Sequence, residues 1–401
     1  MFKTYIMKKL LLLNFLLTTL LSFGQATLIA DINKGNPSSN PAQKITFNGF
    51  TYFPATDGIK GSELWRTDGT EVGTTFFKEF KTGEDNGITN LIGMVANNTM
   101  FFYAWDGTTN NALWKTDGTE AGTIKLKTFS GTFAVSEFEG AEINNEVIFR
   151  VREDNNHSLW KSDGTVAGTI KLKSINPNGI TKMGNEVFFS GDGNDGKGTE
   201  LWKTDGTVAG TVIVKDIVTG SSSSYPRDLR VINGNTIVFY NNSDQKIWKS
   251  DGTETGTVAV TTQSYAVKNM TGNNNEVFFD HISGGITSLW KTDGTEAGTI
   301  ELKNDVGNIK KILKVNSKLL VFSFVFNPTK NLIWVSDGTV AGTTNFETEL
   351  IEFWHNGEYG MVGNNLFFQG NTTIEGYELW KTDGTEAGTK LVRDIHPAKD
   401  D

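Results

Sequence analysis

Short apolar stretches alternate with polar turns along most of this chain, and the alternation recurs in eight copies. Each copy contains one nearly constant phrase, Leu/Ile-Trp-Lys-Thr/Ser-Asp-Gly-Thr-x-x-Gly-Thr. Its successive tryptophans are 49, 46, 42, 46, 42, 44 and 46 residues apart. Periods of this size are typical of repeat architectures, in which each copy forms one supersecondary unit. The tryptophans of the phrase are Trp65, Trp114, Trp160, Trp202, Trp248, Trp290, Trp334 and Trp380.

The copy from Ile180 to Ile217 shows which elements the pattern predicts. Its apolar and β-branched residues form four short runs separated by turns that contain Gly, Asn or Asp: 180–183, 186–190, 200–204 and 211–217. Four short strands in about 45 residues match one blade of a β-propeller. We therefore predict an all-β fold, an eight-bladed β-propeller of four-stranded antiparallel blades. An open β-solenoid of the same repeats is the alternative.

Two further positions recur within the repeats. The turn between the first and second strands contains Asn and Gly, which tolerate the positive φ of tight hairpins; examples are Asn48-Gly49, Asn97-Asn98, Asn144-Asn145, Gly234-Asn235 and Asn274-Asn275. The second strand carries one aromatic residue, replaced by Val321 in the seventh copy: Phe53, Phe102, Phe149, Phe189, Phe239, Phe279 and Phe368. Leu28–Ile32 resembles the fourth strand of a repeat, and we expect it to form a strand that pairs with the last repeat.

The constant phrase has a structural explanation. Side chains alternate along a strand, so the Leu and the Trp of each phrase point to opposite faces and can pack against different neighbouring blades. Each Asp can accept a hydrogen bond from a backbone N–H two residues on, and the two glycines of the phrase allow a left-handed backbone. A carboxylate repeated once per blade cannot converge on one active site, so we assign a structural role to Asp68, Asp117, Asp163, Asp205, Asp251, Asp293, Asp337 and Asp383.

The N-terminal residues differ from the repeats. Three lysines, Lys3, Lys8 and Lys9, precede an apolar run from Leu10 to Leu21, and Ser22-Phe23-Gly24 follows. This pattern predicts a signal peptide over residues 1–25, with residues 26–401 as a single propeller domain. The apolar run is shorter than the roughly 20 residues of a spanning helix, so we do not expect an integral membrane protein. The signal peptide predicts a secreted or cell-surface protein. Because the chain has no cysteine to carry a lipid anchor, we do not expect a lipoprotein.

The net charge and the motifs of the chain limit which partners, metals and catalytic residues can be expected. The formal net charge is −9, and loss of the three N-terminal lysines would take it to −12, which disfavours nucleic acid as a partner. The four histidines lie in different repeats without metal-ligand spacing, and the Asp192–Gly198 stretch departs from a calcium loop at Gly196. We predict no catalytic residue, no metal and no cofactor. Trp105 lies outside the phrase and is either a sugar-stacking platform or part of the core.

The phrase resembles the ELWxxDGT repeat family of secreted proteins from Bacteroidota and related bacteria. The resemblance covers about residues 27–401, and its departures are small, such as Ile247 and Ile333 for Leu, Val335 for Lys and Thr255 for Ala. It implies an exported, propeller-like protein, often followed by a C-terminal sorting domain. The family provides no catalytic residues that could be assigned to this chain.

These observations favour a non-catalytic module that binds an extracellular protein or glycan. We expect it to be a monomer. Two alternatives remain open: a polysaccharide-active enzyme with its site at the channel mouth, and a structural spacer or adhesin segment. The turns on one face of the repeats are uniform, whereas segments of the other face, such as 192–199 and 219–225, vary in length and chemistry. Binding residues concentrate on variable loops of a rigid scaffold, so we predict that a partner docks on the variable face.

Overall fold

The computed structural model describes residues 28–35, 37–108, 111–130, 138–153, 156–272, 274–326, 329–353 and 359–394. The predicted signal peptide, Trp354, His355 and His396 lie outside the described residues. The chain forms two compact units, each considered by itself below. One contains Met1–Leu91, Tyr103–Thr108 and Gly118–Ala121, and the other contains Ile92–Phe102, Thr109–Asp117 and Gly122–Asp401.

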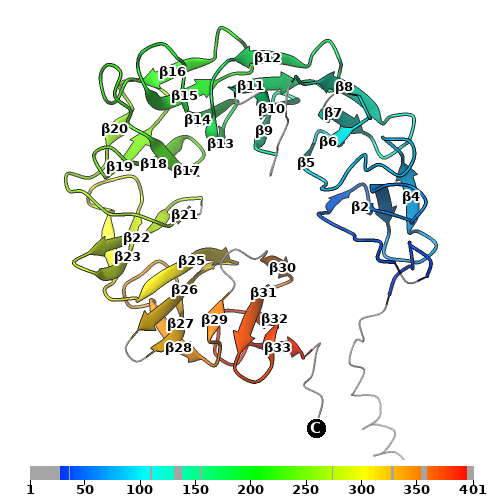
Figure 1. The fold of residues 1–401 in the computed structure, drawn as a ribbon. Coiled ribbons are helices and arrows are strands. Elements are labelled where there is room, and N and C mark those ends of the chain that lie inside the picture. The colour runs from blue at the N-terminus through cyan, green and yellow to red at the C-terminus, as the bar shows by residue number, and fades with distance from the viewer. Residues whose placement is uncertain are drawn as a thin grey trace, which may run out of the picture. The chain divides into compact units, whose positions relative to one another are not determined.

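The described residues form eight antiparallel sheets, one for each copy of the repeat (Figure 1). The first four sheets contain β1 (Ile45–Phe47), β2 (Phe50–Ala55), β3 (Glu63–Thr67) and β4 (Thr75–Lys78); β5 (Gly93–Ala96), β6 (Thr99–Trp105), β7 (Asn111–Thr116) and β8 (Ile124–Thr128); β9 (Gly140–Ile143), β10 (Glu146–Glu153), β11 (Asn156–Ser162) and β12 (Ile170–Lys173); and β13 (Asn178–Met183), β14 (Glu186–Asp192), β15 (Thr199–Thr204) and β16 (Val212–Lys215).

The other four sheets contain β17 (Pro226–Ile232), β18 (Thr236–Asn241), β19 (Lys246–Ser250) and β20 (Val258–Ala259); β21 (Met270–Gly272), β22 (Val277–Ser283), β23 (Ile286–Thr292) and β24 (Ile300–Lys303); β25 (Asn308–Val315), β26 (Lys318–Phe326), β27 (Thr329–Ser336) and β28 (Thr344–Thr348); and β29 (Glu352–Phe353), β30 (Gly360–Val362), β31 (Asn365–Thr372), β32 (Gly376–Thr382) and β33 (Lys390–Arg393). In this last sheet both β29 and β30 pair with β31, so it has five strands.

The predicted fold class is confirmed: the described chain is all-β, and its sheets have the strand order of β-propeller blades, consistent with eight blades. Within the first seven sheets the strands follow one another in sequence order, and all eight sheets are separate rather than continued from repeat to repeat as in a solenoid. The four runs predicted in the fourth repeat correspond to β13–β16, with boundaries that differ by a few residues. No helix among the described residues has the length and apolar character needed to cross a membrane.

The predicted hairpin turns of the first three repeats have the backbone conformation that their residues favour. Positive φ values occur at Asn48, Asn97, Asn98, Asn144 and Asn145. By contrast, the prediction that Leu28–Ile32 forms a strand is wrong. That segment has no strand structure, and Leu28 is 81% exposed, because no neighbouring strand provides a ladder for its backbone.

Packing between consecutive sheets of the second unit explains the spacing of Leu and Trp in the phrase. The first strands β9, β13, β17, β21 and β25 lie next to one another in turn (Figure 1). Five apolar clusters each join the Leu or Ile of one repeat to the Trp of the next: Leu159 with Trp202, Leu201 with Trp248, Ile247 with Trp290, Leu289 with Trp334, and Ile333 with Trp380. Leu379, in the eighth copy of the phrase, is 39% exposed.

Candidate functional site

The eight tryptophans of the phrase lie apart from one another, one in the third strand of each sheet. Trp160, Trp202, Trp334 and Trp380 are buried, and Trp65, Trp114, Trp248 and Trp290 are half-buried. In the seven described registers, the recurrent second-strand residue lies directly opposite the Trp: Phe53–Trp65, Phe149–Trp160, Phe189–Trp202, Phe239–Trp248, Phe279–Trp290, Val321–Trp334 and Phe368–Trp380. These residues therefore contribute to packing and do not form a common site.

The aspartates of the phrase organise the turn between the third and fourth strands. In the fourth repeat, Asp205 Oδ1 accepts hydrogen bonds from the backbone N–H of Thr207 at 2.8 Å and from its hydroxyl at 2.7 Å. The Thr207 hydroxyl oxygen in turn accepts from the backbone N–H of Gly210 at 2.9 Å. The first two bonds recur at Asp68, Asp163, Asp251, Asp293, Asp337 and Asp383.

The two glycines of the phrase have different roles, which corrects the prediction that both allow a left-handed backbone. The first, Gly206 in the fourth repeat, has φ +89°. The second, Gly210, has no positive φ. A Cβ at Gly210 would lie 2.1 Å from Asp205 Oδ1, and every described copy has a contact of this kind. The second glycine is therefore required because the aspartate carboxylate packs directly against its backbone.

Sequence reasoning missed the buried glutamates that lie two residues before a Trp, of which Glu378 in β32 is 6% exposed. Glu63 in β3 and Glu200 in β15 are both 0% exposed. Their position, on the same strand face as the buried Trp, was the available signal. Because a charged group is costly to bury, each needs strong hydrogen-bond donors.

Glu63 and Glu200 each accept hydrogen bonds from the segment that links their own repeat to the next one. Burial raises the pKa of Glu63 to about 7, although the backbone N–H groups lower it in part. Burial likewise raises the pKa of Glu200. We call each arrangement a glutamate clamp. The donors to Glu63 are Phe80 N–H at 2.8 Å, Lys81 N–H at 3.2 Å and Gly87 N–H at 3.1 Å; those to Glu200 are Ile217 N–H at 3.1 Å, Val218 N–H at 3.5 Å, Ser224 N–H at 3.0 Å and Ser224 Oγ–H at 2.5 Å.

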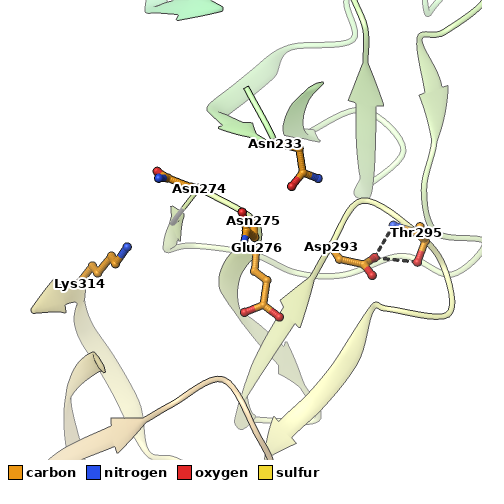
Figure 2. A pocket seen from close by; sticks show the side chains of 7 residues that line it. All are labelled: Asn233, Asn274, Asn275, Glu276, Asp293, Thr295 and Lys314. Carbon is orange, nitrogen blue, oxygen red and sulfur yellow. Dashed lines mark hydrogen bonds between the residues drawn. The ribbon is translucent and has the colours of Figure 1, made fainter. Parts of the chain in front are cut away.

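An open pocket of about 890 Å³ lies on the uniform face, among turns of the fifth, sixth and seventh repeats. Figure 2 shows the side chains that line it: Asn233, Asn274, Asn275, Glu276, Asp293, Thr295 and Lys314. Asn233 comes from the β17–β18 turn, Asn274 from the β21–β22 turn and Lys314 from the end of β25. Two of these turns are joined, since the Asn233 backbone N–H donates to the Asn274 carbonyl at 2.5 Å. The pocket is therefore on the face that sequence reasoning assigned to structure.

The pocket offers hydrogen-bonding groups rather than an acid–base pair. Glu276 Oε1 is bound to Lys291 Nζ at 2.6 Å. The hydrogen bond from the Thr295 hydroxyl lowers the pKa of Asp293, so that carboxylate stays ionised. A general acid needs a raised pKa. The carboxyls with raised pKa values, Glu63 and Glu200, are fully buried and bound to backbone N–H groups.

The remaining candidate positions have ordinary partners. One face of the Trp105 ring has Lys81 Nζ 4.9 Å from its centroid, and Trp105 Nε1–H donates to the Thr108 carbonyl at 2.8 Å. His281 Nδ1 accepts from the Ala266 N–H at 3.1 Å, and burial lowers the pKa of this histidine. Among the described residues, no three or more His, Asp or Glu side chains are grouped so that they could hold a metal ion.

No protein-family model matches the chain, and neither does any curated protein. Similar solved structures include puromycin hydrolase (TM-score 0.42, 10% identity, 92% of this chain and 55% of that chain) and a Mycobacterium tuberculosis puromycin-hydrolyzing peptidase (0.43, 10%, 77% and 54%). The nidogen/laminin complex is also similar (0.32, 11%, 63% and 92%). The chain spans about half the length of the two hydrolases. Similarity at this level does not identify an activity, substrate or partner.

Proposed function

We propose that this protein is an exported, non-catalytic β-propeller of the ELWxxDGT repeat type that binds an extracellular protein or glycan in the asparagine-lined pocket. The observation that carries the proposal is the pocket itself, which three asparagines from two turns and a lysine from a third repeat line together (Figure 2). Amide groups both donate and accept hydrogen bonds, so they suit recognition of polar, uncharged groups.

The surroundings of the pocket support binding rather than catalysis. Asp293 and Thr295 lie in a turn that the Asp-Gly-Thr hydrogen bonds fix, and the turns of Asn233 and Asn274 are joined by a backbone hydrogen bond. Rigid placement of this kind lowers the entropic cost of binding. The pKa of Asp293 is lowered by its hydrogen bond from Thr295, and Glu276 forms an ion pair with Lys291, so the pocket does not offer the protonated carboxyl group that a glycosidase needs.

The binding proposal is tested on a glycan array and on an array of purified surface proteins. We expect the wild-type protein to bind one class of ligand, and Asn274→Ala or Lys314→Ala to weaken that binding about tenfold. Lys182→Ala is the matched control, because Lys182 holds the same position in β13 as Lys314 does in β25 but does not line the pocket. Unchanged binding by both pocket variants, or no binding by the wild type on either array, would contradict the proposal.

Export is tested separately. The basic and apolar N-terminal pattern supports cleavage near Gly24 or Gln25. N-terminal sequencing of the protein recovered outside the cytoplasm should begin there. Full-length chain confined to the cytoplasm would refute export.

A further inference from the structure

Tyr225 has an unusual backbone conformation. Its φ is +49°, although it directly precedes Pro226. Bulky residues rarely adopt positive φ, and residues before proline favour an extended backbone. All other described non-glycine residues with positive φ are Asn, Asp or Gln. Such strain persists only where the surroundings impose it, and it concentrates at functional sites.

The second glutamate clamp and a contact from the fifth repeat together hold this conformation. The Thr199 carbonyl accepts hydrogen bonds from Ser224 N–H at 3.0 Å and from Tyr225 N–H at 3.2 Å. Glu200 holds Ser224 through both its N–H and its hydroxyl. On the other side, the Tyr225 carbonyl accepts from Asn242 N–H at 3.4 Å. The backbone on both sides of the Tyr225 side chain is therefore fixed, and the side chain is 54% exposed.

The clamp alone does not require an exposed aromatic residue. In the first repeat the Ser62 carbonyl accepts from Gly87 N–H and Ile88 N–H, each at 3.0 Å, and Glu63 holds Gly87. Ile88 thus occupies the position of Tyr225, but it is 3% exposed and lacks a positive φ. Two copies of one hydrogen-bonded arrangement bury an aliphatic side chain in one repeat and display an aromatic ring in the other.

The link that ends at Tyr225 is neutral and polar, and the nearest charged residues after it, Arg227 and Asp228, form an ion pair with each other at 2.6 Å. No charged residue occurs between Ile217 and Tyr225, and four serines precede the tyrosine. The segment that contacts it from the fifth repeat is Asn241-Asn242-Ser243, also uncharged. An aromatic face with amide and hydroxyl groups beside it complements a sugar ring, which has an apolar C–H face and a hydroxylated edge.

We propose that Tyr225 is a stacking platform for a neutral carbohydrate, with Asn242 as a hydrogen-bonding neighbour. This site lies on the variable face, whereas the asparagine-lined pocket lies on the uniform face. Trp105, the platform candidate suggested by the sequence, differs because a lysine ammonium lies over its ring. The exposed ring, the uncharged link before it and the mutual pairing of Arg227 with Asp228 favour a neutral sugar over an anionic one or a charged peptide.

The experiment uses the full mature protein in affinity electrophoresis with dextran, xylan, β-glucan and, as an anionic comparison, pectin. We expect retardation by at least one neutral polysaccharide, loss of about tenfold in affinity for Tyr225→Ala, and retention for Tyr225→Phe, which keeps the ring. Asn242→Ala should weaken binding less. Tyr377→Ala is the matched control, because Tyr377 is similarly exposed, at 45%, in another repeat.

The outcomes separate this site from the asparagine-lined pocket. The Tyr225 platform is supported if Tyr225→Ala loses polysaccharide binding while Asn274→Ala and Lys314→Ala bind fully. This outcome supports the platform whether or not the asparagine-lined pocket binds a ligand. Equal retardation of Tyr225→Ala and wild type overturns it, as does a wild type that none of the neutral polysaccharides retards. Preference for pectin, or loss in Tyr377→Ala to the same extent, also overturns it. Thermal melting curves that match wild type exclude unfolding as the cause of any loss.

Discussion

The two glutamate clamps have the same hydrogen-bond pattern and opposite consequences. Glu63 and Glu200 are equally buried, and each receives backbone N–H groups from the link that follows its repeat. Above the first clamp Ile88 enters the core, whereas above the second Tyr225 turns outward with a left-handed backbone. The comparison teaches that the clamp fixes the backbone path of the link. The residue that follows the clamped N–H then determines whether its side chain packs into the core or is exposed to solvent.

The largest effect should come from removing the clamp carboxylates. Glu63→Ala or Glu200→Ala leaves several buried donors without an acceptor, and we expect the free energy of unfolding to fall by roughly 3–5 kcal/mol in either variant. Urea denaturation measures this loss, with Glu142→Ala in the half-buried strand β9 as a control. A loss below about 1 kcal/mol at either position would show that the clamps do not hold their links.

The next test separates packing from display. Ile88→Ala should lower the free energy of unfolding by roughly 2–4 kcal/mol, because it removes a buried aliphatic side chain. Tyr225→Ala should change it by about 0.5 kcal/mol or less, as exposed substitutions do. Similar losses in the two variants would break the comparison, since Tyr225 would then contribute to the core as Ile88 does.

A third test uses pH. The pKa of Glu63 is raised from 4.5 to about 7 in the folded protein, so the folded state binds the proton more tightly than the unfolded chain. Its contribution is therefore fully present below pH 4.5 and is lost as the pH rises through about 7. We expect this group to lower the free energy of unfolding by about 2 kcal/mol between pH 5 and pH 7. Urea midpoints measured across this range should fall less steeply with pH in Glu63→Gln than in the wild type.

Glu200 should add to the slope in the same direction, because its pKa is also raised. The aspartates of the phrase contribute no pH dependence of stability in this range. The pKa values of Asp68 and Asp205, for example, are lowered from 3.8 by hydrogen bonds from Thr70 and Thr207, so these carboxylates are ionised in both states throughout this window. If Glu63→Gln leaves the slope unchanged, the Glu63 carboxyl does not titrate in this range.

The smallest effect concerns strain. Tyr225→Asn places a residue that tolerates positive φ at this position, and we expect the free energy of unfolding to rise by about 1 kcal/mol. Differential scanning calorimetry would detect the rise as a higher melting temperature. Ile88→Asn should lower the free energy of unfolding, because Ile88 is buried and its backbone has no positive φ whose strain an Asn could relieve. A destabilised Tyr225→Asn protein would mean that its backbone is not strained.

Much of the fold could be predicted from the sequence because its signals are local. The Trp spacing predicted eight four-stranded units, and strand alternation predicted that Leu201 and Trp202 face different neighbours. Two local inferences were wrong. Gly210 was interpreted by its backbone freedom, whereas close contact with Asp205 requires it, and Leu28–Ile32 resembles a strand but has no ladder partner.

The candidate sites were less accessible to sequence reasoning. Asn274 and Lys314 are about 40 residues apart and appear as an ordinary turn residue and an ordinary strand residue, and only folding brings them to one pocket. Trp105 attracted attention as an aromatic residue outside the phrase, while Tyr225 carried no motif at all. Its exposure and its positive φ depend on contacts with Thr199 and Asn242, which lie in other strands and loops.

The sequence by itself determined the repeat, the strand order and the turn chemistry, because hydrophobic periodicity and turn residues act over a few positions of the chain. The tertiary structure alone decided which glutamates are buried, which link displays a side chain and where the pocket lies. These properties depend on hydrogen bonds and contacts between residues that are distant in sequence. Identical local patterns, as at Glu63 and Glu200, therefore support different surfaces.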